Sequence, residues 1–518
     1  MVSAVLFITF FVLLVLNVPI SVCLGLSSAA AILYSGTSLT IVATNIYSGI
    51  SKFLLLAIPF FVLSGNIMAK AGISTRLIRF VDTCVGHRKG GIANVCIIVA
   101  CFFGAISGSG PATVAALGAV LIPAMVERGG FSAAFSTALM ATSSSIAIVI
   151  PPSIAFVVYA SITGVSIGDM FMAGIIPGIL MGLALVVVVM LEVRRNHVVP
   201  STVEKASAKE RWNAFKDAFW GFLMPVIILG GIYGGIFTPT EAAAVSVVYG
   251  LFVGMIIYKE VKFKDLWEIL IDSAKTTGGI MLIVACASLF SFVCTRFGIS
   301  TAASELLARV AGNQFTFLLI CNIIFLIAGC FIDANSAMYI FIPIMLPVCK
   351  ALGYNVIAFG IMATVNLAIG QVTPPVGVNL FVAIGIKLRD GIRVTLQEIS
   401  RAVVPMVAAS IVVLLIITYI PQISTCLPAA LGSAAAIENG ETAGGDSGTT
   451  QTDNDDFNTI GDYSDLDWAD MTWNFTCSTT ETSTWAQAGR KFGELMEQAT
   501  GGKVKVDVYA ADQLTGGN

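Results

Sequence analysis

The chain has 518 residues, of which 57% are hydrophobic and only 11% are charged. Soluble globular proteins carry about 25% charged residues, so this composition excludes a soluble globular protein. The net charge of −3 also hides two unlike regions, because residues 1–429 hold 24 Lys and Arg against 16 Asp and Glu, whereas residues 430–518 hold 4 against 15.

The first apolar stretch, residues 1–51, contains no charged residue. It lacks a basic start, and it is longer than the roughly 7–15-residue core of a secretory signal, so we expect a retained membrane anchor. Asn17, Val18 and Pro19 either kink one long helix or separate two short ones. The sequence leaves both arrangements open, and with them the side of the membrane on which the N-terminus lies.

Basic residues form four clusters, at residues 70–89, 194–216, 259–275 and 387–401. Cytoplasmic loops retain positive charge, so an even number of membrane crossings should separate successive clusters. Three apolar segments, however, lie between the first two clusters: 92–126, 132–160 and 170–191. The number of crossings becomes even if residues 92–126 form a re-entrant helical hairpin, which enters the membrane and returns to the same side. The helix-breaking sequence GAISGSGP at residues 104–111 predicts the tip of this hairpin.

The second half repeats this pattern between the third and fourth clusters. Residues 315–349 carry the breaker GCFIDANS at 329–336, and the proline pairs 151–152 and 374–375 interrupt the apolar segment after each hairpin. By the charge rule the two hairpins open to opposite sides of the membrane. We therefore expect an all-α polytopic membrane protein with two inverted repeats, about 92–191 and 315–420, each with a re-entrant hairpin and a broken transmembrane helix.

Broken helices free backbone carbonyls, and nearby hydroxyls add the oxygen ligands that a sodium ion needs. Isolated Ser and Gly residues in membrane helices usually serve packing, but clusters at both breaks favour ligand sites. In the first half the candidate ligands are Ser107, Ser109 and the carbonyls near Gly110, facing residues 142–145 and the carbonyls freed before Pro151 and Pro152. In the second half they are Gly329, Asp333, Asn335 and Ser336, facing Asn366, Gly370, Thr373 and the carbonyls around Val376.

The returning half-helices direct their N-terminal N–H groups at the tips, a favourable setting for a carboxylate substrate. The predicted substrate-lining residues are Asp333, Asn335, Ser336, Asn366 and Asn379. Asp333 is the only carboxylate in the second hairpin, and its alternative role is an N-cap of the returning arm. Residues 238–241 (TPTE) form a capping box, so Glu241 is predicted to be structural.

Other chemistry lacks support in the sequence. No pair of the 11 Cys residues has CxxC spacing, so neither a zinc site nor a disulfide framework is predicted. His87 and His197 lie in basic loops, which argues against a histidine proton relay. No Gly-rich phosphate-binding motif is present, so an ATP-driven pump is disfavoured. An intramembrane enzyme is disfavoured because no His/Glu metal motif or Ser/Lys nucleophile pair appears, and a passive channel because inverted repeats with broken helices are costly without alternating access. We expect no enzyme activity, no cofactor, no metal other than sodium and no nucleic-acid partner.

Five motifs carry a family resemblance: IPFFVLSG at 58–65, SGSGPATVAA at 107–116, IPPS at 150–153, GIFTPTEAAA at 235–244 and TPPVG at 373–377. With them, residues 1–425 resemble the large membrane subunit of tripartite ATP-independent periplasmic (TRAP) transporters. The resemblance implies a bacterial inner-membrane, elevator-type transporter that takes up an organic acid (a C4-dicarboxylate, sugar acid or keto acid) with sodium. It also implies a small four-helix membrane subunit and a periplasmic substrate-binding protein as partners. The sodium sites that it implies are a first site at Ser107, Ser109, Gly110, Ser144, Ser145, Val149 and Pro151 and a second site at Gly329, Gly370, Thr373 and Val376. A proton-coupled anion transporter, with Asp333 as the carrier, stays open as the alternative.

The acidic tail has its own organisation. Residues 1–429 are the predicted membrane transport domain, and residues 402–420 are expected to cross outward, so that the tail lies in the periplasm. Residues 430–467 read as a flexible acidic linker. Residues 468–518 resemble the truncated start of a TRAP substrate-binding protein, with a strand at 473–478, a helix at 485–498 and a strand at 501–509. A natural fusion and a gene-model artefact both remain open.

Overall fold

The computed structural model describes residues 2–16, 18–195, 205–386, 394–432, 471–477, 490–494, 496–497 and 503–510. The chain divides into two compact units, Met1–Gly440 and Glu441–Asn518, and each is described by itself.

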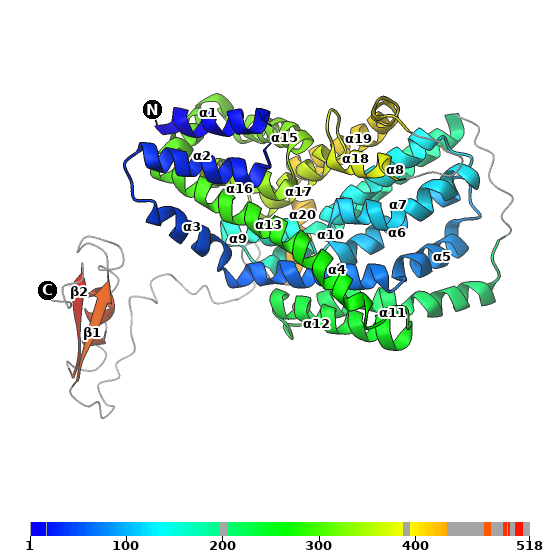
Figure 1. The fold of residues 1–518 in the computed structure, drawn as a ribbon, viewed down its shortest axis with the longest axis horizontal. Coiled ribbons are helices and arrows are strands. Elements are labelled where there is room, and N and C mark those ends of the chain that lie inside the picture. The colour runs from blue at the N-terminus through cyan, green and yellow to red at the C-terminus, as the bar shows by residue number, and fades with distance from the viewer. Residues whose placement is uncertain are drawn as a thin grey trace, which may run out of the picture. The chain divides into compact units, whose positions relative to one another are not determined.

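The first unit is built of helices (Figure 1). Its first half contains α1 (Val2–Val15), α2 (Ile20–Tyr34), α3 (Thr40–Ile50), η1 (Phe53–Leu56), α4 (Ala57–Lys70), α5 (Ile73–Val85), α6 (Gly91–Ser107), α7 (Gly110–Glu127), α8 (Ala133–Ser145), η2 (Ile146–Ile148), α9 (Ile154–Thr163) and α10 (Ile167–Arg195). Its second half contains α11 (Ala208–Tyr233), α12 (Pro239–Leu251), η3 (Phe252–Ile257), α13 (Asp265–Arg296), α14 (Ile299–Ala311), α15 (Gln314–Phe331), α16 (Ala334–Ala351), α17 (Val356–Gly370), α18 (Val378–Ile384), α19 (Leu396–Tyr419) and α20 (Gln422–Ala430).

These helices confirm an all-helical, multi-span membrane fold for this unit. Within the described ranges, nine helical segments are long and apolar enough to cross a membrane. The apolar start of the chain forms two short helices, α1 and α2, that pack against each other, and not one long kinked helix. Thr238 and Glu241 form the predicted capping box at the start of α12, which confirms the structural role of Glu241.

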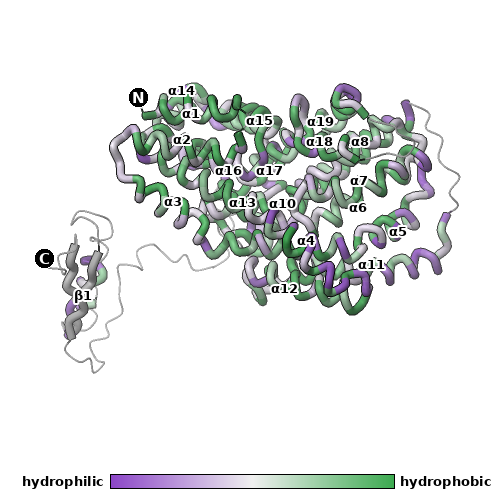
Figure 2. Tube along the Cα trace, viewed as in Figure 1, coloured by the Kyte–Doolittle hydropathy of each residue, from purple (hydrophilic) through white to green (hydrophobic). Residues whose placement is uncertain are grey.

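Three of the four basic clusters are connected by ion pairs at one end of the unit. Arg76 of α5 lies 2.6 Å from Glu260, and Lys70 of α4 lies 3.1 Å from Glu268 of α13. Arg79 lies 3.6 Å from Asp217 of α11. Figure 2 shows the hydrophilic residues of this region on α5 and on the N-terminal half of α11. The three clusters therefore lie on one face of the unit, in agreement with an even number of membrane crossings between successive clusters.

Two helix pairs and two interrupted helices build the centre. Gly108 and Ser109 separate α6 from α7, and Ile332 and Asp333 separate α15 from α16. After each pair a buried helix is interrupted: residues 149–153 follow α8 and η2, and residues 371–377 follow α17. The proline pairs lie in these interruptions, and each contains a cis peptide bond. The helix breaks thus occur where the sequence predicted them.

The second unit contains β1 (Met471–Cys477) and β2 (Val504–Ala510), which pair in parallel with Met471 opposite Val504 and Cys477 opposite Ala510. Residues 490–494 between them are helical. The predicted order of strand, helix and strand is confirmed for the described residues. From residue 433 onward, the predicted linker lies outside them.

Candidate functional site

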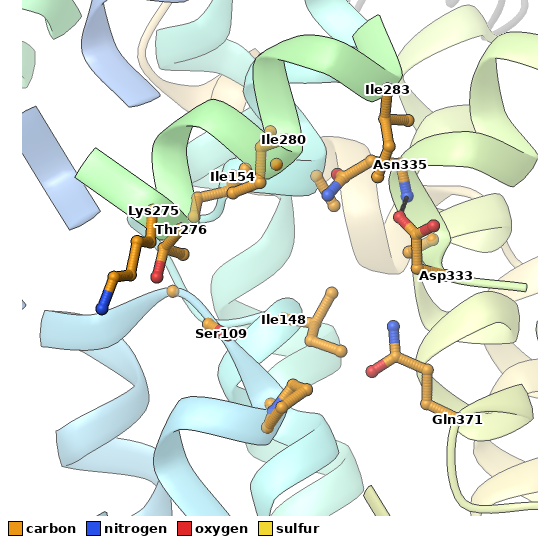
Figure 3. Close-up of a pocket in the computed structure, with 16 residues that line it drawn as sticks. Ser109, Ile148, Ile154, Lys275, Thr276, Ile280, Ile283, Asp333, Asn335 and Gln371 are labelled. Atoms are coloured by element: carbon orange, nitrogen blue, oxygen red, sulfur yellow. Dashed lines mark hydrogen bonds between the residues drawn. The ribbon is translucent and has the colours of Figure 1, made fainter. Parts of the chain in front are cut away.

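The two turns that join the helix pairs meet at one cavity. We call Gly108 to Pro111 the first tip and Asp333 to Asn335 the second tip. A cavity of about 380 Å³ is lined by both tips, by Ile148, Ile154 and Ala155 of the first interrupted helix, and by Gln371 of the second. Its remaining wall is α13, which contributes Lys275, Thr276, Gly279, Ile280 and Ile283 (Figure 3).

Hydroxyl hydrogen bonds organise the first tip. The Oγ of Ser107 lies 2.8 Å from the Oγ1 of Thr113, which donates to the carbonyl of Ser109 at 2.8 Å. A Cβ added at Gly108 would lie 2.7 Å from the carbonyl oxygen of Pro152, so this carbonyl faces the tip. The structure therefore brings the carbonyl of Pro152 against the first tip.

The other predicted residues of the first sodium site are placed differently. The Oγ of Ser145 donates to the carbonyl of Thr142 at 2.7 Å. A Cβ added at Gly174 would lie 2.5 Å from the carbonyl oxygen of Val149, so that carbonyl faces α10. Pro151 is buried in the interruption beside Pro152. Ser109 and Gly110 belong to the first tip and Ser107 directly precedes it, whereas the carbonyl of Val149 is not brought to it.

Asn379 of α18 reaches the first tip from the second half of the chain. Its Nδ2 donates to the Oγ of Ser144 at 3.2 Å, and Ser144 donates to the carbonyl of Ala141 at 2.6 Å. A Cβ added at Gly110 would lie 2.8 Å from Nδ2 of Asn379. This side chain, predicted to line the substrate, instead lies within the predicted first sodium site.

The second predicted sodium site lies where α15 crosses α17. A Cβ added at Gly370 would lie 2.5 Å from the Cα of Gly329, so these backbones touch. The Oγ1 of Thr373 donates to the carbonyl of Ile369 at 2.8 Å, and the N–H of Gly377 donates to the carbonyl of Cys330 at 3.2 Å. Val376 lies in the same interruption and is half-buried. The structure thus brings Gly329, Gly370 and Thr373 together.

Asp333 lines the cavity and also caps α16. Its Oδ2 accepts hydrogen bonds from the backbone N–H groups of Asn335 and Ser336, at 3.1 and 3.2 Å. Its Oδ1 accepts a hydrogen bond from the Ser336 hydroxyl. The N-cap alternative is therefore confirmed. Asn335 lines the cavity beside Asp333, and Ser336 is held by the cap.

Asn366 lies away from the cavity wall. Its Nδ2 donates to the carbonyl oxygen and to the Oδ1 of Asn322, at 2.9 and 2.8 Å. It is fully buried in α17, and its place in the structure is a polar contact between α15 and α17. The structure does not bring Asn366 to the cavity with Asp333 and Asn335.

Sequence reasoning missed Gln371 and the α13 residues. Lys275 is the only cationic side chain among the described residues that line the cavity, and Figure 3 shows it across the cavity from Asp333 and Gln371. Its Nζ lies 3.7 Å from the Oδ1 of Asp272. In the sequence, Lys275 belongs to the basic cluster at residues 259–275. Its helical spacing from Asp272 and Gly279 would have placed all three on one face of α13.

Buried oxygens without partners surround the tips. The side-chain oxygens of Asn335, Gln371 and Asn379 are buried and accept no hydrogen bond from the described part of the chain. Neutral oxygen donors of this kind suit hard cations, so the residues present fit a sodium ion. No group of three or more His, Cys, Asp or Glu residues that could hold a metal ion occurs among the described residues.

Known proteins resemble this chain over most of its length. The model of the family "Tripartite ATP-independent periplasmic transporter, DctM component" matches residues 7–423. The C4-dicarboxylate TRAP transporter large permease protein DctM of Rhodobacter capsulatus is 38% identical over 436 residues, covering 81% of this chain and 97% of that protein. The protein of the same name from Pseudomonas aeruginosa is 41% identical over 410 residues, covering 79% and 94%.

A fused relative and a solved structure extend the comparison. The isethionate TRAP transporter permease protein DctMQ of Oleidesulfovibrio alaskensis is 40% identical over 420 residues, covering 81% of this chain and 65% of that protein. The solved structure of the Alcanivorax borkumensis YdaH transporter has a TM-score of 0.54 and 14% identity, and covers 76% of this chain and 89% of that one. At this identity, the likeness to YdaH concerns the fold alone.

Proposed function

This chain belongs to the family of the DctM component of tripartite ATP-independent periplasmic transporters, and we propose that it couples uptake of an organic acid to sodium entry across the bacterial inner membrane. It is a multi-pass transporter permease and not an enzyme. The observation that carries the proposal is that both tips, both interrupted helices and Lys275 line the same cavity. An anion can bind at Lys275 and the N-terminal ends of α7 and α16, while unpartnered amide oxygens favour sodium.

We propose further that the two halves are inverted repeats that move as an elevator. Arg128, at the end of α7, lies 2.9 Å from Asp82 of α5 and so connects the base of the first helix pair to α5. Lys70, just before α5 in the chain, forms an ion pair with Glu268 in the first turn of α13. The second helix pair follows α14, which begins directly after the last turn of α13. The two helix pairs are thus connected to opposite ends of α13, a helix of 32 residues, which supports opposite orientations of the two pairs in the membrane.

The substrate class and partners are part of the same proposal. Two relatives are named for C4-dicarboxylates and one for isethionate, all small organic anions. We propose a C4-dicarboxylate, sugar acid or keto acid as substrate, delivered by a periplasmic binding protein with a small membrane subunit in the complex. The acidic tail would then lie in the periplasm, where β1 and β2 are interpreted as the start of a binding-protein-like domain.

Sodium coupling predicts a specific transport result. Proteoliposomes holding the chain with its small subunit should accumulate radiolabelled substrate only when sodium outside exceeds sodium inside and the binding protein is present. Replacing external sodium by potassium should reduce uptake to the level of empty liposomes. Accumulation that persists without sodium would disprove the coupling.

A proton-coupled mechanism makes a different prediction, because it needs Asp333 to titrate during transport. The three hydrogen bonds that Asp333 accepts as N-cap favour a structural role instead. An asparagine keeps an N-cap oxygen, so we expect D333N to change stability little and to leave the pH profile of uptake unchanged. Loss of the pH dependence in D333N, together with sodium-independent uptake, would support proton coupling.

Lys275 is expected to contribute to substrate affinity. In K275Q, the apparent KM for substrate should rise about tenfold, because hydrogen bonds to charged groups contribute about 1.5–3 kcal/mol, while K275R should stay near the wild-type value. K264Q is the matched control, since Lys264 caps the same helix and does not line the cavity. Equal KM values for K275Q and K264Q would remove Lys275 from the site.

A further inference from the structure

A second cleft lies between α5 and α11, at the end of the unit where the basic clusters gather. It has a volume of about 380 Å³ and is lined by Phe80 of α5 and by Ala208, Arg211, Trp212 and Phe215 of α11. The two helices pack against each other along this stretch. None of these residues lines the cavity between the two tips, so the cleft is a separate site.

Two donors of the Arg211 guanidinium lack a partner among the residues that the structure describes. Its Nε and Nη2 are buried and have no hydrogen-bond partner among the described residues. Two nearby carboxylates are engaged elsewhere: Glu210 accepts hydrogen bonds from the N-cap Ser207, and Asp217 lies 3.6 Å from Arg79. Leaving two buried donors unpaired is costly, so the cleft is suited to an anion.

The walls of the cleft are aromatic. The rings of Phe80 and Phe215 lie 5.6 Å apart, and the rings of Trp212 and Phe215 are stacked at 5.6 Å. The Nζ of Lys216 lies 5.5 Å from the centroid of the Trp212 ring, a further cation beside the cleft. An anion that fits here also offers apolar surface to these rings.

The position along α11 identifies the kind of anion. Charged residues end at Asp217, and the rest of the helix, from Ala218 to Tyr233, is uncharged. Trp212 is 57% exposed at this boundary, where aromatic side chains mark the membrane interface. Basic pockets between membrane helices on the cytoplasmic side bind anionic lipid headgroups.

We propose that this cleft binds an anionic phospholipid, whose headgroup phosphate accepts hydrogen bonds from Arg211 and whose acyl chains follow the aromatic wall of α11. The bound lipid contacts α5 through Phe80. Because Asp82 of α5 lies 2.9 Å from Arg128 at the end of α7, the lipid occupies a site next to the base of the first helix pair.

Lipid binding to the purified full-length chain in detergent, followed by native mass spectrometry, tests this site. The probes are phosphatidylglycerol and phosphatidylcholine with identical acyl chains, titrated against wild type, R211Q, R211K and K209Q. Lys209 is exposed on the same turn of α11 and does not line the cleft, so K209Q removes the same charge outside it. We expect wild type to prefer phosphatidylglycerol, R211Q to bind it about fivefold more weakly, and R211K and K209Q to stay near wild type.

Three outcomes would overturn the proposal. Equal losses in R211Q and K209Q would mean that only the overall charge matters, and equal binding of the two lipids to wild type would mean that no headgroup is recognised. Displacement of phosphatidylglycerol by millimolar inorganic phosphate would make this a phosphate site instead of a lipid site. Thermal unfolding of each variant, measured in parallel, excludes misfolding as the cause of weak binding.

Discussion

Replacing Gly370 by Ala should abolish uptake. The added Cβ would lie 2.5 Å from the Cα of Gly329 and 2.6 Å from its carbonyl carbon. Both are backbone atoms, so no side-chain rotation relieves the clash, and α15 must move away from α17. A displacement of about 1 Å in a functional site costs on the order of 100-fold in rate, and we expect a loss of at least that size in G370A.

Gly230 provides the matched control for this substitution. It lies inside α11, and a Cβ there would meet nothing within 4 Å. G230A should therefore transport at the wild-type rate. Initial uptake rates in proteoliposomes, normalised to the amount of inserted protein, make the comparison, and thermal unfolding in detergent reports how much of the effect is lost stability. Wild-type uptake by G370A would show that the contact of Gly329 with Gly370 is not needed for transport.

Replacing Asn379 by Ala should raise the sodium concentration for half-maximal uptake by about tenfold or more. Asn379 lies between the first tip and Ser144, and its Oδ1 is buried without a hydrogen-bond partner among the described residues. It is therefore suited to act as an oxygen ligand or to orient the Ser144 hydroxyl. Loss of a residue that supports metal ligands typically costs 10–100-fold in affinity.

The control for this prediction is Asn322, a buried amide of α15 that makes its hydrogen bonds with Asn366 and Thr418. N322A should lower stability through the lost hydrogen bonds and leave the sodium dependence of uptake unchanged. Uptake measured over a sodium series at saturating substrate separates the two effects. If N379A and N322A shift the sodium dependence equally, Asn379 has only a packing role.

The helix breaks could be predicted from the sequence because each has a local cause. Gly and Ser residues end α6 at 107, Asp333 caps α16, and each proline pair removes backbone donors that a continuous helix would need. The clusters of Lys and Arg predict an even number of crossings between them, and this number requires one re-entrant helix pair in each half. The structure places three of these clusters on one face. These features depend on residues within one or two helical turns, which a sequence displays directly.

The tertiary structure alone decided which groups meet at the cavity. Asn379 lies beside Ser144, 235 positions earlier in the chain, and Lys275 enters the cavity from α13, outside both helix pairs. The carbonyl of Val149 faces α10, and Asn366 binds Asn322. Such contacts depend on how helices distant in sequence cross and rotate against one another, and no local pattern encodes that geometry. The sequence by itself determined the family, the membrane fold and the positions of both tips, whereas packing decided the neighbours of each tip.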